Sequence, residues 1–526
     1  MSDSSVYPLD CGSWRRLSER YGSKETAAVE WMDRSLNWCF GFFHDEAVLC
    51  AREAARADPA WCFPYAVIAH ARAPNYNNAE FEADDVEEAK QAIAEGQTKT
   101  GGTGVEKQFL AAQAARYAAV DFSDCSKAAQ CYKEKMEALF AVAPDDTEVA
   151  TFLVEALLQI HPWRLYDKEG NPKAEAVRAR VVIMDGLGRD SKHPGLIHFF
   201  IHLVEMSPNP AEGLPSANFF REPVSYVGDN SHLFHMPSHL DVLVGAYRDA
   251  IEANKKAIER DRKVVAVRGP KGFFTLYRLH NRHLLIYAAL MAGCKEEALA
   301  AARDIYDELT TEMVAPLPDW LEAFKGVYLE VLIRFGMWDP ILKVEPPEDP
   351  ELFCSFAASR HYARGIAFAA LSDVSKAREE SALFETAVSK VPSSRVLFNN
   401  SMADIFGIAR EMLKGETDYR AGEFESAFAA LNRAVERDDG LVYDEPWAWM
   451  VPVRNALGAL LLEQNRVEEA RKVYEEDLKR HPLNVWSSHG LRECEETMGE
   501  QPTIEMPTTA DVKIVASCFC RLSKCC

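Results

Sequence analysis

The chain has 526 residues, of which 48% are hydrophobic and 27% are charged, and its formal net charge at pH 7 is −22. This composition is typical of a soluble globular protein that can bury a large core. The negative charge argues against nucleic acid as a partner, because little positive charge is left to neutralise phosphates, and against binding to an anionic membrane surface.

The two ends of the sequence give expectations about location. The opening MSDSSVYPLDCGSW has no basic stretch followed by an apolar run, so we expect no signal peptide, and no apolar stretch is long enough for a membrane span. We therefore expect a cytoplasmic protein whose thirteen cysteines are mostly reduced thiols. The final SCFCRLSKCC, ending in Cys525 and Cys526, fits a double prenylation signal, a pair of soft-metal ligands or a frayed end.

Apolar residues recur at helical spacing along nearly the whole chain, and no segment shows the sustained alternation of a strand. Four segments also repeat one pattern, in which small residues recur at fixed positions among the apolar residues of predicted helices. These segments are 31–59, 247–261, 419–438 and 454–482. In the last segment the pattern consists of Leu457, Gly458, Ala470, Tyr474 and Pro482. Small residues at a helix crossing allow two antiparallel helices to approach closely.

These segments resemble tetratricopeptide repeats, and the resemblance covers about residues 28 to 490. It implies an all-α fold of about ten helical hairpins in a right-handed superhelix that could curl around a central cavity. The domains expected from it are an N-terminal extension, N-terminal hairpins, central hairpins with most of the histidines, C-terminal hairpins and a flexible tail: 1–27, 28–190, 191–315, 316–496 and 497–526.

The central part of the chain concentrates histidine. Of fourteen histidines, eight lie between positions 193 and 283, and seven of these fall into three groups within HFFIHLVE, HLFHMPSH and HNRH. In the first group His198, His202 and Glu205 share one helical face, because residues four and seven apart point the same way. Two imidazoles one helical turn apart are a common way to offer two ligands to one metal ion.

Alignment of the groups by Gly213, Ala250 and Ala298 places the histidines on the first helices of three consecutive hairpins. In tetratricopeptide repeats these positions line the concave groove, so the resemblance implies that the histidines face one common space, and their spacing predicts a metal site there. The predicted ligands are His198, His202, Glu205, His235, His239, His280 and His283. The alternative is that the histidines belong to a polar peptide-binding groove or are core residues bonded to the backbone.

The chain also resembles a narrower group of uncharacterised bacterial tetratricopeptide proteins that share short landmarks, for which no activity is established. The shared landmarks are HDEA, APNYN, PW before DKEGNPK, HPG, IHxxE, HMPSH, HNxH and YDEPWAW followed by VPVR. The aromatic-Asn-His of that group is Phe42-Phe43-His44 here, which leaves the role of that Asn without a counterpart. Landmark residues are predicted to bind the substrate: His44, Tyr76, Trp163, Tyr443 and Trp447. Catalytic roles are assigned to Glu205, His232, Glu445 and Arg454.

The ligand set points to one or two transition-metal ions, copper, iron or zinc, because six or seven imidazoles exceed what one tetrahedral zinc needs. We therefore predict a metalloenzyme that acts on a small molecule in the groove, an oxidoreductase more than a hydrolase because the set is rich in histidine. The competing hypothesis is a non-catalytic scaffold that binds a peptide or protein partner. The sequence offers no phosphate loop, dinucleotide fingerprint or nucleophile elbow.

Overall fold

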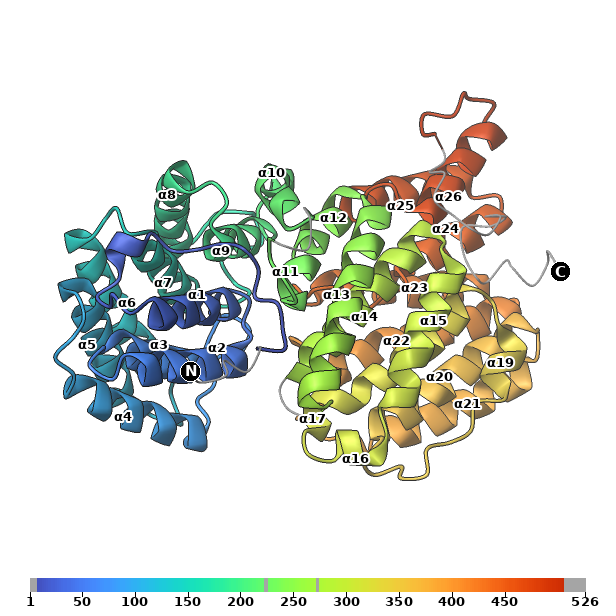
Figure 1. Ribbon diagram of the computed structural model, residues 1–526. Helices are drawn as coiled ribbons and strands as arrows, with labels where there is room; N and C mark the ends of the chain where they lie inside the picture. The colour runs from blue at the N-terminus through green and yellow to red at the C-terminus, as the bar shows by residue number, and fades with distance from the viewer. Residues whose placement is uncertain (1–6, 222–225, 271–273, 506–526) are drawn as a thin grey trace. The chain divides into compact units, whose positions relative to one another are not determined.

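The computed structural model describes residues 7–221, 226–270 and 274–505, and these form helices almost throughout (Figure 1). The only strands in the described residues are β1 (Val396–Leu397) and β2 (Asn400–Ser401), which pair in antiparallel fashion. The predicted all-α class is therefore confirmed. The Cys-rich end, 517–526, lies outside the described residues.

The chain divides into two compact units. Unit 1 consists of residues 1–240 and 256–270, and unit 2 of residues 241–255 and 271–526. We describe each unit by itself.

Unit 1 begins with a short 3-10 helix and continues with successive helices of the hairpin type. Its elements are η1 (Ser18–Arg20), α1 (Thr26–Phe40), α2 (His44–Ala57), α3 (Phe63–Ala71), α4 (Ala83–Gln97), α5 (Gly104–Ala118), α6 (Ser126–Val142), α7 (Thr147–Leu158), α8 (Ala174–Arg189), α9 (Pro194–Val204), η2 (Pro210–Gly213), α10 (Leu214–Ala217), η3 (Asn218–Arg221) and α11 (Ser231–His235). Two further helices, α12 (Pro237–Val244) and α13 (Tyr247–Arg268), each contribute residues to both units.

Unit 2 contains the remaining elements. They are α14 (Phe274–Ala292), α15 (Lys295–Glu308), α16 (Thr311–Val314), α17 (Pro318–Leu321), η4 (Glu322–Gly326), α18 (Val327–Arg334), α19 (Trp338–Leu342), α20 (Cys354–Ala370), α21 (Val374–Val388), β1, β2, α22 (Met402–Arg420), α23 (Phe424–Gly440), α24 (Val453–Glu463), α25 (Val467–Arg480) and α26 (Val485–Thr497).

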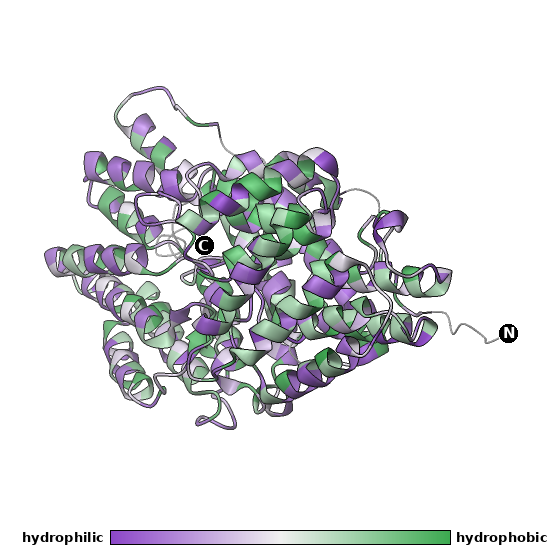
Figure 2. Ribbon diagram, turned by 90° about the vertical axis from the view of Figure 1, so that its left-hand side faces the viewer, coloured by the Kyte–Doolittle hydropathy of each residue, from purple (hydrophilic) through white to green (hydrophobic). Residues whose placement is uncertain are grey.

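Consecutive helices pack against each other in pairs within each unit: α1 with α2, α3 with α4, α5 with α6 and α7 with α8, then α14 with α15, α20 with α21, α22 with α23 and α24 with α25. Hydrophobic and hydrophilic residues mix along single helices (Figure 2), as expected where one face of a helix is buried against its neighbour. Each hairpin leaves an apolar face that the next one covers, which is how helical repeats build their core.

The small residues of the repeat pattern have the predicted role in unit 2. A Cβ atom on Gly458 of α24 would lie 2.5 Å from Cζ of Tyr474, and one on Gly490 of α26 would lie 2.2 Å from the same atom. The Tyr474 ring, which is 0% exposed, therefore fits between these helices only because both positions lack a side chain.

The segment around Gly213 is not one regular helix. Residues 210–221 form η2, α10 and η3 in succession. The cause is proline at 208, 210 and 215, since proline lacks the N–H that continues a helix. Gly213 still provides a close contact, because a Cβ atom there would lie 2.7 Å from Leu240 and 2.8 Å from Val204.

No helix within the described residues combines the length and the apolar character needed to cross a membrane.

Replacement of Gly458 by alanine should destabilise unit 2. The added methyl group overlaps the Tyr474 ring, and overpacking of this kind costs roughly 1–3 kcal/mol. The matched control is Gly440→Ala at the end of α23, where nothing lies within 4 Å of the new Cβ atom. Urea unfolding should show a lower midpoint for Gly458→Ala and an unchanged or higher one for Gly440→Ala. Equal midpoints for wild type and Gly458→Ala would contradict the close packing.

A buried carboxyl group in α18 should make the stability of unit 2 depend on pH. Burial raises the pKa of Glu330 to about 8, although a backbone N–H of Met450 partly offsets this, and its Oε2 has no hydrogen-bond partner among the described residues. Because its pKa is raised in the folded state, Glu330 is tolerated there when it is protonated and destabilises the fold when it ionises. Relative to Glu330→Gln, wild type should therefore lose about 1.4 kcal/mol of unfolding free energy per pH unit between about pH 4.5 and 8. If the unfolding free energies of the two proteins, measured with urea, change with pH in the same way across this range, the raised pKa of Glu330 is contradicted.

Candidate metal centre

Helix α9 carries two of the predicted ligands and has a well-defined start. Nδ1 of His193 accepts a hydrogen bond from the backbone N–H of Leu196 at 3.3 Å, and Pro194 occupies the first turn, where its missing N–H has no cost. The helix is buried along its whole length, so His198 and His202, one turn apart, are both 0% exposed. Their Nε2 atoms lie 3.1 Å apart.

A third imidazole comes from α11, whose first turn is fixed against α1. Oδ1 of Asn230 accepts from the N–H of Leu233 at 3.4 Å, and its Nδ2 donates to the carbonyl of Asn37 at 3.2 Å. This double contact holds the start of α11 where Nε2 of His232 lies 3.2 Å from Nε2 of His198.

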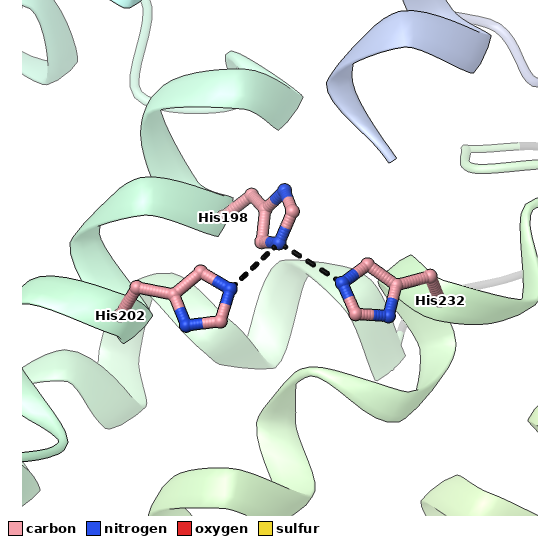
Figure 3. Close-up of side chains that lie close together, drawn as sticks. All are labelled: His198, His202 and His232. Atoms are coloured by element: carbon pink, nitrogen blue, oxygen red, sulfur yellow. Dashed lines mark hydrogen bonds between the residues drawn. The ribbon is translucent and has the colours of Figure 1, made fainter. Parts of the chain in front are cut away.

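We call His198, His202 and His232 the three-histidine set. Figure 3 shows the three rings pointing toward one another, with Nε2 of His198 between the other two. Their potential ligand atoms all lie within 4.8 Å of one another, and all three residues are buried.

Hydrogen bonds on the opposite side of two of these rings decide which nitrogen carries the proton. Nδ1 of His198 lies 2.6 Å from the carbonyl oxygen of Phe40, which can only accept, so Nδ1 is the donor. Nδ1 of His202 donates to Oε1 of Glu205 at 2.9 Å. Burial raises the pKa of Glu205, but its contacts with His202 and His239 outweigh this and hold the pKa well below its usual range, so the carboxylate is ionised.

The second predicted group of histidines lies on the other side of Glu205. Nδ1 of His239 donates to Oε2 of Glu205 at 2.7 Å, and Nε2 of His239 lies 2.7 Å from Nε2 of His235. We call His235 and His239 the histidine pair. Both are buried, His235 at the end of α11 and His239 in the first turn of α12, just after Pro237.

Aromatic rings cover the three-histidine set. The Phe42 ring centroid lies 4.6 Å from that of His198 and 5.6 Å from that of His232, and Tyr76 lies 4.5 Å from His202. Phe42 has a φ of 60°, a left-handed conformation that costs a non-glycine residue on the order of 1–3 kcal/mol and often marks a functional position. Phe42 was not among the predicted site residues, and the aromatic run before His44 is the one signal for it in the sequence.

Other predicted substrate-binding residues of unit 1 lie next to these rings. The backbone N–H of Trp163 donates to the hydroxyl of Tyr76 at 3.2 Å, and the two rings are 5.3 Å apart. The His44 ring lies 5.8 Å from Phe42, and burial lowers the pKa of His44 to about 4. Unit 1 therefore brings Tyr76, Trp163 and His44 into the aromatic surroundings of the set, while their role toward a substrate stays a prediction.

Two predicted ligands belong to α14 in unit 2. Nε2 of His283 lies 3.1 Å from the sulfur of Met450, and burial lowers the pKa of His283 to about 3. The His280 ring lies 5.2 Å from Phe398. Their assignment as metal ligands stays a prediction.

The remaining predicted residues lie in or just after the segment 441–452 of unit 2. The rings of Tyr443 and Trp447 are 5.7 Å apart. Arg454 makes a bidentate ion pair with Asp439, with both N–O distances at 2.7 Å, which is a structural use of its guanidinium group. Glu445 is 9% exposed. Catalytic roles for Glu445 and Arg454 stay predictions.

Comparison with known proteins finds no matching family model and no match among the curated proteins. Among solved structures the chain is similar to a human IFIT1 dimer with m7Gppp-AAAA, at 11% identity over 91% of this chain and 88% of that one, with a TM-score of 0.33. It is also similar to yeast Tom70, at 11% identity over 90% of each chain with a TM-score of 0.29. The P58(IPK) TPR domain aligns at 10% identity over 90% of this chain and 98% of that one, with a TM-score of 0.19. The helix pairs, with small residues where they cross, give this chain an all-α fold of helical hairpins, as the repeat pattern predicts.

Proposed function

We propose that this chain is a metal-binding helical repeat protein, and that its three-histidine set holds one transition-metal ion. The observation that supports this most directly is the facing pair of Nε2 atoms on His198 and His202, which are 3.1 Å apart. Each ring already uses its Nδ1 as a donor, to Phe40 and to Glu205. Where both rings are neutral, each Nε2 carries a lone pair, and two lone pairs at this distance repel each other.

Protonation of His198 does not readily relieve this repulsion. Burial, together with the neighbouring His202, keeps the pKa of His198 well below its ordinary value, so the ring stays neutral near pH 7. A cation shared by the two nitrogens does relieve it. Two ligands bound tetrahedrally at 2.0–2.1 Å are about 3.3 Å apart, close to the Nε2 separations of 3.1 and 3.2 Å in the set.

The type of ligand limits which metals the set could bind. Neutral imidazole suits copper, iron and zinc, whereas calcium and magnesium prefer oxygen. Three histidines also leave a coordination position for water or a small substrate, which distinguishes catalytic sites from closed structural ones. The metal would supply Lewis-acid or redox chemistry at that position.

We therefore extend the proposal to a metalloenzyme acting on a small molecule, with oxidoreductase chemistry favoured over hydrolysis because the set consists of imidazole. The chain's own contribution is to orient the ligands through Phe40, Glu205 and Asn230. Phe42 and Tyr76 cover the rings and keep bulk water away from them.

A non-catalytic scaffold is the second candidate, and the hairpin fold itself favours it, since repeats of this kind offer extended surfaces to partners. It differs in one clear respect. Partner binding by a scaffold should survive removal of metal, whereas the function proposed here should not.

Metal content of the purified chain tests the first proposal. Full-length protein freed of any polyhistidine tag should retain about one equivalent of a transition metal, or bind it on addition, and His202→Gln and His232→Gln should each weaken binding by at least about tenfold. The matched control is His161→Gln, because His161 lies in unit 1 and its side chain is 34% exposed beside Glu175. Less than about 0.1 equivalent of metal in wild type, with no uptake from added zinc or copper, would rule out the site.

Bound metal should also raise the thermal stability of the folded chain. Zinc at one hundred times its Kd adds about 2.7 kcal/mol to a protein that binds it only when folded. The expected result is a higher melting temperature for wild type and for His161→Gln, measured by calorimetry with and without zinc. The same shift in His198→Gln would show that zinc binds elsewhere and contradict the assignment.

A further inference from the structure

Glu205 occupies an unusual position between the two histidine groups of unit 1. Its side chain is 0% exposed, and its two carboxylate oxygens accept from two imidazoles on different helices, His202 on α9 and His239 on α12. In both cases the donor is Nδ1, so both Nε2 atoms face away from the carboxylate. One buried anion thus fixes the proton position in two rings.

We propose that Glu205 is a positioning residue shared by the three-histidine set and the histidine pair, and that occupation of the set is transmitted through it to the pair. The tautomer part of this inference stands on the contacts of Glu205 alone. The transmission part rests on the metal-binding function proposed above.

The route of transmission is a continuous series of contacts. It runs from Nε2 of His202, across the ring to Nδ1, and through Oε1 and Oε2 of Glu205 at 2.9 and 2.7 Å to Nδ1 of His239. It ends at Nε2 of His235, 2.7 Å from Nε2 of His239. A cation on Nε2 of His202 polarises its ring and strengthens the Nδ1–H bond to Glu205. The carboxylate then has less charge to offer His239.

The same contacts argue against Glu205 as a direct ligand. A carboxylate oxygen that bound the ion would have to leave the Nδ1–H group it now accepts from, and one buried donor would lose its partner. A buried polar group without a partner is destabilising, so this exchange is unfavourable. Carboxylates that orient metal-binding histidines from behind are a common arrangement, and their loss typically lowers metal affinity about 10–100-fold.

Glutamine at this position provides a sharp test. Its amide can accept from one imidazole but must donate to the other, so His202 and His239 cannot both keep Nδ1–H. Solid-state NMR of full-length, tag-free protein with ¹⁵N-labelled imidazole rings reports the tautomers, and His202→Gln and His239→Gln assign the two signals. In metal-free wild type both rings should be Nδ1–H tautomers, and in Glu205→Gln one of them should convert.

Zinc supplies the second readout, because it is diamagnetic and suits imidazole. One equivalent should shift the nitrogen signals of His239 in wild type even though His239 is not in the three-histidine set. Glu205→Gln should bind zinc about 10–100-fold more weakly and lose the His239 response. The matched control is Glu155→Gln, which disturbs another buried pair of unit 1, Glu155 with His70 at 3.0 Å, and should leave zinc affinity unchanged.

The outcomes separate this inference from the proposed function. Zinc affinity in Glu205→Gln equal to wild type, or Nε2–H tautomers in wild type, would overturn the positioning role. A zinc-bound His202 ligated through Nδ1 would overturn it as well, because Glu205 would no longer hold that nitrogen. If wild type binds no metal but Glu205→Gln still converts one tautomer, the positioning role stands and the metal-binding proposal fails.

Discussion

A buried imidazole has two nitrogens, and each needs a donor, an acceptor or a cation, because water is not there to supply one. That requirement organises the centre of unit 1. The carbonyl of Phe40 and the carboxylate of Glu205 accept hydrogen bonds from Nδ1–H of His198 and His202, which turns both Nε2 atoms toward the same point. The facing arrangement of the two Nε2 atoms therefore depends on where these two acceptors lie.

The acceptors lie correctly because the turn after α1 is tightly packed. The carbonyl of Phe40 is at the C-terminal end of α1, and Gly41 follows it. A Cβ atom on Gly41 would lie 2.0 Å from Nδ2 of Asn230, the residue that starts α11. Glycine therefore allows α1 to contact α11 directly, and Phe42 then takes a positive φ of 60° and covers the rings. This short turn therefore supplies the carbonyl acceptor of Phe40, the close contact at Gly41 and the Phe42 ring that covers the histidines.

The same turn contains Phe43, the position at which the sequence departs from the bacterial group that it resembles. Phe43 stands where that group has asparagine, and in the structure Phe43 is the N-cap of α2 without a side-chain cap. Asparagine is among the best residues for this position, because its side chain accepts from the first free N–H groups. Here Phe43 packs on Trp38 instead, with ring centroids 5.3 Å apart.

Sequence periodicity predicted what is local. The helical class, the close contact of Gly458 with Tyr474 and the shared face of His198 and His202 all depend on residues a few turns apart or on a repeated pattern. The succession of short helices at 210–221 is local as well, because it follows from three prolines in the sequence. Contacts between residues far apart in the sequence could not be predicted from spacing. Phe42 over His232, Asn230 on Asn37 and Glu205 between two helices depend on packing that no spacing rule contains.

Burial also bears on the choice between a metal site and a peptide-binding groove in a histidine-rich repeat. In a groove that binds a peptide, histidines face solvent until the partner arrives, and each ring can give one nitrogen to water. The rings of the three-histidine set are 0% exposed, and the Nε2 atoms of two of them lie 3.1 Å apart. A surface that binds a protein partner gains nothing from that arrangement, and two neutral rings at this distance repel each other. A cation between the nitrogens would replace the repulsion by two bonds, which is why the buried geometry favours the metal-binding proposal.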